Sequence, residues 1–69
     1  MDLTWIERQL IRTIAECDLN VTQAARVFHY HRNTLVYHIE KIRRKTGLDP
    51  RVFWDMVKLL EAMDESNPV

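Results

Sequence analysis

The sequence contains few residues that cross-link a chain or bend it sharply: its 69 residues include one cysteine, one glycine and two prolines. The single cysteine, Cys17, excludes an internal disulfide and provides no zinc-ligand pattern, so we expect a reducing, cytoplasmic setting. The scarcity of turn residues favours helices joined by short loops over a β-sheet.

Long apolar runs are also missing. No stretch approaches the ~20 apolar residues of a membrane span, and charged residues interrupt every apolar run near the start. We therefore expect neither a membrane-bound protein nor a secretion signal.

Net charge is absent as well, because ten Lys and Arg balance ten Asp and Glu. The charges are nevertheless segregated along the chain. Residues 1–20 carry two basic and four acidic side chains, residues 21–46 carry six and one, and residues 47–69 carry two and five. The basic middle third predicts a surface that attracts a polyanion, since the local field decides where a polyanion binds.

What the chain does have is apolar content, 46% of its residues, in repeats typical of helices. Sixty-nine residues suit one domain near the lower size limit for an independent core. The repeats predict an all-α fold with four helices over residues 3–17, 21–28, 32–46 and 50–63, and a frayed tail over residues 64–69.

Each predicted helix has an apolar stripe that would face the core. The stripes are Leu3, Ile6, Leu10, Ile14 and Cys17, widened by Ile11, in the first helix; Val27 and Phe28 in the second; Leu35, Ile39 and Ile42 in the third; and Val52, Phe53, Met56, Leu59, Leu60 and Met63 in the fourth. Two small residues, Ala24 and Ala25, would let the second helix cross another closely.

Capping residues define the predicted starts of three helices. Asp2 is expected to cap the first, and Asn20 followed by Gln23 resembles a capping box for the second. Asp49 as N-cap with Pro50 at the first helical position would begin the fourth.

The third helix is bounded by signals of its own. His31 would cap its start, and Gly47 would end it in the left-handed conformation. The turn before it needs a residue with positive φ, and His29 is the candidate because histidine tolerates that region.

A short helix, a tight turn and a longer basic helix predict a helix-turn-helix, whose second helix enters the major groove of DNA by its N-terminal end. The base-reading candidates are Arg32, Asn33 and Tyr37, because Arg pairs with guanine and Asn with adenine. The candidates for contacts to the DNA backbone are Thr22, Thr34, Lys41, Arg43 and Arg44.

Simpler roles stay open for several of these side chains. A basic stretch on a helix is commonly a solvated face. Tyr37 would cover the edge of the core, Asn33 would help to cap the helix, and His31 would act as a cap rather than as a base reader.

Residues 20–25 (NVTQAA), residues 31–35 (HRNTL) with Tyr37, and residues 46–49 (TGLD) form a set of spaced motifs. Over about residues 3–63 the chain resembles the C-terminal domain of PucR/CdaR-type regulators, bacterial transcription factors of purine catabolism and sugar-diacid utilisation. The resemblance implies a four-helix fold with a Fis-like helix-turn-helix, sequence-specific DNA binding and a sensor region outside this sequence.

Two positions depart from the family pattern. His38 stands where the family usually has Arg, which removes one phosphate contact at neutral pH. Trp54 and Asp55 lie in a segment that usually has small residues and leucines, which affects how the last helix packs.

Trp5, Trp54 and Val57 fall outside the predicted apolar stripes. Single exposed aromatics need no explanation. Alternatively, these residues form a homodimer interface, with two recognition helices about one DNA turn (~34 Å) apart, or they contact the sensor region of a longer parent chain.

Catalytic and metal chemistry are not expected. His29, His31, His38 and Cys17 lack the spacing of a tetrahedral metal site, and no acid–base pair or nucleophile–base set can be assembled. We therefore expect no enzyme, no cofactor and no small-molecule site in this domain.

The sequence thus predicts sequence-specific double-stranded DNA binding by the DNA-binding domain of a bacterial transcriptional regulator. The alternatives are a helical protein–protein interaction module and a Fis-like architectural protein that binds DNA without reading its sequence.

Overall fold

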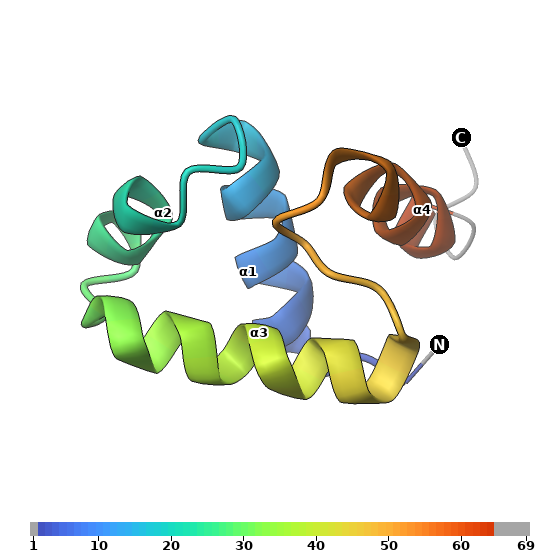
Figure 1. Ribbon diagram of the computed structural model, residues 1–69, viewed down its shortest axis with the longest axis horizontal. Helices are drawn as coiled ribbons and strands as arrows, with labels where there is room; N and C mark the ends of the chain where they lie inside the picture. The colour runs from blue at the N-terminus through green and yellow to red at the C-terminus, as the bar shows by residue number, and fades with distance from the viewer. Residues whose placement is uncertain (1, 65–69) are drawn as a thin grey trace.

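The computed structural model describes residues 2–64, which form four α-helices and no strand (Figure 1). The helices are α1 (Trp5–Glu16), α2 (Val21–Val27), α3 (Arg32–Thr46) and α4 (Phe53–Asp64). The predicted all-α, four-helix fold is confirmed. Within the described residues, no helix has the length and apolarity needed to cross a membrane.

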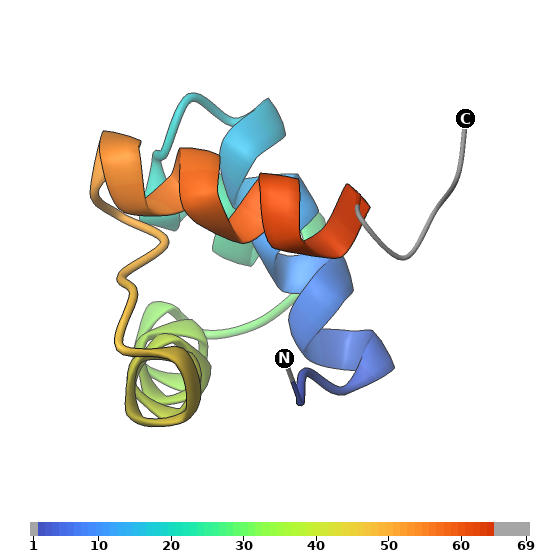
Figure 2. The ribbon, with the colours of Figure 1, turned by 90° about the vertical axis from the view of Figure 1, so that its right-hand side faces the viewer.

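The helix α1 occupies the centre of the molecule. It packs against α2 on one side and α4 on the other, and α2 also packs against α3. Figure 1 shows α3 lying along one edge, and Figure 2 shows α3 end-on while α4 runs crosswise to it. One long side of α3 is therefore left uncovered by the other helices.

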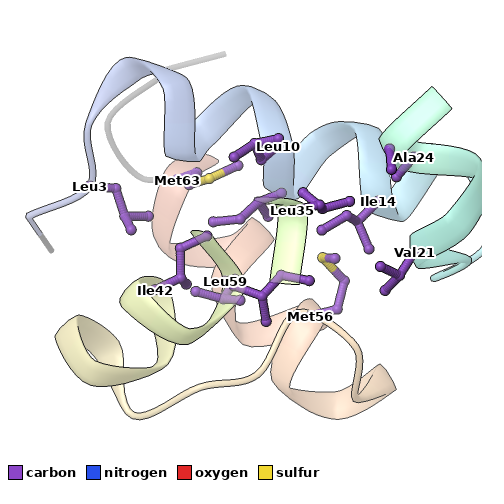
Figure 3. Close-up of a cluster of buried hydrophobic side chains, with 13 residues drawn as sticks. Leu3, Leu10, Ile14, Val21, Ala24, Leu35, Ile42, Met56, Leu59 and Met63 are labelled. Carbon is purple, nitrogen blue, oxygen red and sulfur yellow. The ribbon is translucent and has the colours of Figure 1, made fainter. Parts of the chain in front are cut away.

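The core receives side chains from all four helices, as Figure 3 shows. Those with no exposed surface include Leu10, Ile11, Ile14, Leu35, Ile39, Ile42 and Leu59. Burying each such side chain contributes about 1.5–3 kcal/mol. The predicted core face of the third helix, Leu35, Ile39 and Ile42, is confirmed in full.

The start of α1 differs from the prediction. Thr4, not Asp2, is the N-cap, because its hydroxyl accepts a hydrogen bond from the Glu7 N–H at 3.1 Å. The Glu7 carboxylate in turn accepts one from the Thr4 N–H at 2.9 Å, which completes a capping box. Glu7 is buried as a result, whereas Ile6, placed in the core by the prediction, is 38% exposed.

The helix α2 begins at Val21 as predicted, and Asn20 Oδ1 accepts a hydrogen bond from the Gln23 N–H at 3.0 Å. The helix ends at Val27, with Phe28 as its C-cap. Phe28 packs against the core, but Val27 is 57% exposed, so its predicted core role is wrong.

The helix α4 begins at Phe53, three residues after the predicted start at Pro50. Asp49 Oδ1 accepts a hydrogen bond from the Arg51 N–H at 2.8 Å, and the Asp49 carbonyl accepts one from the Val52 N–H at 3.0 Å. These bonds close a turn with the buried Pro50 at its second position, which suits the fixed φ of proline.

The late start of α4 changes which of its residues are buried. Met56, Leu59 and Met63 are buried as predicted, but Val52 and Phe53 are 48% and 59% exposed, so their predicted core role is wrong. Asp64, assigned to the frayed tail, is the last residue of α4. The rest of that predicted tail, residues 65–69, lies outside the described residues.

Candidate nucleic-acid interface

The turn between α2 and α3 sets the angle of the exposed helix. His29 has φ 57°, as predicted, and Tyr30 N–H donates to the Ala25 carbonyl while His29 N–H donates to the Arg26 carbonyl. These two bonds form a Schellman motif, which satisfies the last carbonyls of α2. The turn is therefore tight although no glycine occurs in it.

His31 caps the start of α3, as predicted, with Nδ1 accepting from the Asn33 N–H at 3.4 Å. The Asn33 side chain makes no hydrogen bond within residues 2–64, so it does not help to cap the helix. Arg32, Asn33 and Thr34 are all exposed, and within residues 2–64 their side chains have no hydrogen-bond or ion-pair partner. The first turn of α3 thus presents three unengaged polar side chains.

Tyr37 lies one turn further along the same side of α3. Its side chain is 57% exposed, which is more than expected for a residue that covers the edge of the core. Lys41 Nζ lies 5.6 Å from the centroid of its ring, a cation–π contact that orders both side chains.

His38 is held in a row of rings that crosses the turn. Its ring stacks on Tyr30 at 5.7 Å between centroids and meets Tyr37 edge-on at 5.6 Å, and Tyr30 in turn contacts Phe28. His38 is therefore a packing residue that joins the turn to α3. The sequence pattern predicted only the loss of the phosphate contact that an arginine would make there, and not this packing role.

Two of the three cations in the last turn of α3, Arg43 and Lys45, have carboxylate partners. Arg43 Nη1 donates to Glu40 at 3.0 Å, and Arg43 Nε lies 3.6 Å from Asp49 Oδ2. Arg51 also pairs with Asp49 and Glu40, at 3.0 and 3.2 Å. Its guanidinium hydrogen bond keeps the pKa of Asp49 below its ordinary value, despite the opposing effect of burial.

Lys45, on the opposite side of α3 from Arg43, also has a carboxylate partner. Its Nζ donates to Glu7 Oε1 at 2.8 Å, which ties the end of α3 to the start of α1. Burial alone would raise the pKa of Glu7, but the bonds from Lys45 and from the Thr4 N–H outweigh it, so this pKa lies below its ordinary value.

The structure thus divides the basic residues of the middle third into two groups. Arg43 and Lys45 are neutralised by carboxylates. Arg26, Arg32 and Arg44 are exposed, and neither they nor Lys41 has an ion-pair partner within residues 2–64. The available positive charge therefore lies along the exposed side of α2 and α3 rather than in the Lys41–Lys45 cluster as a whole.

The exposed, basic side of α3 continues onto the outer face of α2. Thr22 is exposed there and lines a shallow, open hollow with Asn20, Gln23, Arg26 and Val27. Their hydroxyl, two amides and guanidinium can donate hydrogen bonds to phosphate oxygens.

Trp5 and Trp54 are 69% and 70% exposed, and Val57 is partly buried. Trp54 and Val57 lie within one turn of α4. Val57 lines a hollow with Ala15 near the end of α1, whereas Trp5 lies ten residues before Ala15, ~15 Å along the helix axis. The structure therefore separates Trp5 from the other two residues.

Among the residues that the structure describes, no three His, Cys, Asp or Glu side chains are grouped so that they could hold a metal ion.

The short helix α2, the tight turn and the exposed helix α3 define a helix-turn-helix domain. A model of the PucR C-terminal helix-turn-helix domain matches residues 8–64, and the chain belongs to this family. The match confirms the PucR resemblance and supports a role in DNA binding and transcription regulation. Searches of curated proteins and of solved structures found no match to this chain.

Proposed function

We propose that this domain binds double-stranded DNA in a sequence-specific manner, as the DNA-binding part of a bacterial transcriptional regulator. One observation carries the proposal: α3 buries one face completely, while its opening turn exposes Arg32 and Asn33 without partners. A fifteen-residue helix is ~22 Å long, and the major groove, ~12 Å wide, admits one such helix.

The proposed contacts follow from the order of side chains along α3. Arg32 donates to guanine O6 and N7, and Asn33 pairs with adenine N6 and N7. Tyr37, one turn further on, contacts a thymine methyl or a sugar with its ring. Its position is held by Lys41 and His38.

The proposed backbone contacts surround this reading end. Thr22, Thr34, Lys41 and Arg44 donate to phosphates, and Arg26 joins them because it is exposed beside Thr22. Arg43 is reassigned from phosphate contact to a structural role, because Glu40 and Asp49 hold its guanidinium.

The resemblance to PucR/CdaR-type regulators makes the operators of purine-catabolism or sugar-diacid genes the first DNA targets to test. We place the site of action in the cytoplasm, where bacterial DNA lies. A sensor region in a longer parent chain would supply the signal.

The function is tested by selecting bound duplexes from a random pool with the 69-residue chain. We expect enrichment of one half-site, and a log–log salt dependence that corresponds to several phosphate contacts. Binding without enrichment would indicate an architectural protein. Absence of salt-dependent duplex binding would favour the protein–protein module and overturn the proposal.

A further inference from the structure

Glu40 is the only acidic residue in the basic middle third of the chain, residues 21–46. It lies three residues after Tyr37 and four before Arg44, spacings that place the three side chains beside one another on the surface of a helix. Tyr37 and Arg44 are exposed, and the side chain of Glu40 is 39% exposed. A carboxylate therefore lies on the side of α3 that is proposed to enter the major groove.

Two guanidinium groups hold this carboxylate in place. Arg43 Nη1 donates to its two oxygens at 3.0 and 3.2 Å, and Arg51 Nη2 donates to Oε1 at 3.2 Å. Arg51 is itself fixed by Asp49, since its Nε and Nη2 donate to the two Asp49 carboxylate oxygens at 3.0 Å. Glu40 is thus oriented from the turn that follows α3 as well as from α3 itself.

The Glu40 carboxylate can accept one more hydrogen bond. Its two oxygens have about four acceptor positions, and within residues 2–64 it accepts three hydrogen bonds. A negative charge at this place lowers the affinity for DNA in general, because phosphates repel it. The repulsion is offset where a base edge donates a hydrogen bond to the remaining acceptor position.

We propose that Glu40 is a specificity-determining residue of the DNA-binding surface, whose carboxylate accepts a hydrogen bond from the N4 amino group of a cytosine. This inference rests on the proposed function. The major groove presents two amino donors, cytosine N4 and adenine N6. Adenine N6 lies between two acceptors, adenine N7 and thymine O4, which repel a carboxylate, whereas cytosine N4 has an acceptor, guanine O6, on one side only. Cytosine is therefore the preferred partner.

The position of this cytosine follows from the helix geometry. Glu40 lies three residues after Tyr37, which corresponds to ~4.5 Å along the helix axis. This distance is close to one base-pair step of ~3.4 Å, so the cytosine lies next to the base pair that Tyr37 contacts. Arg43 and Arg51 are positioning residues in this arrangement, because they act through Glu40.

The test compares the duplexes that the wild-type chain, Glu40→Gln and Glu40→Ala select from a random pool. The wild type should enrich a cytosine beside the base pair that Tyr37 contacts. Glu40→Gln should select adenine there instead, because glutamine pairs with adenine N6 and N7. Glu40→Ala should lose the preference at this position only. An unchanged half-site in both variants, or loss of preference at every position, would overturn the inference.

Fluorescence anisotropy measures the size of the effect. Replacing the selected G·C pair by A·T should weaken wild-type binding about 10-fold, as for a typical mismatched pair, and Glu40→Ala binding by less than ~2-fold. Equal weakening of both proteins would overturn the inference. The matched control is Glu16→Gln, which removes an exposed carboxylate from α1 and should keep the wild-type discrimination. Circular dichroism checks that each variant keeps its helices.

A variant of Arg51 tests how Glu40 is positioned. Arg51→Gln removes the hydrogen bond from the turn, so the preference for cytosine should weaken while the preference at the position of Arg32 stays. Arg51→Lys keeps the positive charge and should retain more of the cytosine preference. Equal loss of both preferences in Arg51→Gln would contradict its role as a positioning residue.

Failure of this inference differs from failure of the proposed function. A wild-type chain that binds duplexes without enriching any half-site would overturn both. A wild-type chain that enriches a half-site which both Glu40 variants retain would overturn this inference alone.

Discussion

At the scale of single residues, the structure separates the cations of α3 by their partners. Arg32 and Arg44 are exposed and unpaired within residues 2–64, whereas Arg43 and Lys45 contact carboxylates. The sequence contains all four as equivalent basic residues of one helix. Their different roles follow from Glu7 and Asp49, which lie on other elements, and from Glu40, which lies one turn before Arg43 on α3.

Arg32→Ala should lower affinity for the selected duplex by about 1–3 kcal/mol and affect random DNA much less, because a base-reading side chain discriminates between sequences. Fluorescence anisotropy with both duplexes measures the difference. Arg12→Ala is the control, since Arg12 is an exposed arginine on α1. Equal losses on both duplexes would remove Arg32 from the base-reading set.

Arg44→Ala and Lys41→Ala should weaken binding to all sequences and lower the salt slope by ~1 each, as expected for phosphate contacts. Arg43→Ala should leave that slope nearly unchanged. It should instead destabilise the fold slightly, by at most ~1 kcal/mol, because its ion pairs are half exposed. A salt slope reduced as much by Arg43→Ala as by Arg44→Ala would return Arg43 to the DNA contacts.

Glu7→Gln should destabilise the fold at pH 7 by about 1–2 kcal/mol, because the charged partner of Lys45 is lost. The pKa of Glu7 is lower in the folded state than its ordinary value near 4.5. Its stabilising effect is therefore complete above that value and is lost as the pH falls through the folded-state pKa.

Urea unfolding at pH 7 and pH 3 measures this effect. The difference in unfolding free energy between wild type and Glu7→Gln should be smaller at pH 3. Glu16→Gln, at an exposed position of α1, should show little difference at either pH. A difference that is independent of pH would contradict the role assigned to the Glu7 carboxylate.

At the scale of elements, α3 was predictable and the start of α4 was not, whereas the start of α1 carried a local signal, the Thr4 and Glu7 capping box, that the prediction missed. The signals for α3 are local: apolar residues at helical spacing, His31 before it and Gly47 after it. The start of α1 depends on Glu7, whose burial is tolerated because Lys45, 38 residues away in sequence, provides its counter-charge. Sequence spacing does not contain that contact.

The start of α4 shows a competition between two local structures. Asp49 and Pro50 suit a helix start, but they equally suit a turn. The turn is favoured because Arg51 binds the Asp49 carboxylate while also pairing with Glu40 of α3. The stacking of His38 on Tyr30 also depends on tertiary structure, because the angle of the turn between α2 and α3 brings the two rings together. The residue types alone do not predict that angle.

The turn before α3 provides a prediction of its own. His29→Gly should stabilise the fold by about 0.5–1 kcal/mol, because His29 has φ 57° and glycine adopts this region without a steric penalty. Thermal unfolding should show a rise of several degrees, as expected for a domain of this size.

The control for this substitution is Glu61→Gly, at an exposed position inside α4, which should cost about 1 kcal/mol. A destabilised His29→Gly protein would mean that the imidazole makes a contribution larger than the backbone strain.

At the scale of the whole molecule, two surfaces share one small core. The proposed DNA-binding surface consists of the exposed sides of α2 and α3, and the end of α1 and the start of α4 lie on the opposite side of the molecule (Figures 1 and 2). The neutral total charge conceals this division, because the acidic residues lie mainly in the first and last thirds of the chain. A polyanion is therefore attracted to one side and repelled from the other.

The most direct test of the central claim is an NMR titration of the isotope-labelled chain with the selected duplex, following every backbone amide. The account predicts the largest shift changes at the start of α3, residues 31–41, and at residues 20–26 around α2, with little change over residues 53–60 on α4. Largest changes on α4 and the end of α1, with α3 unaffected, would contradict the assignment of α3 as the helix that enters the major groove.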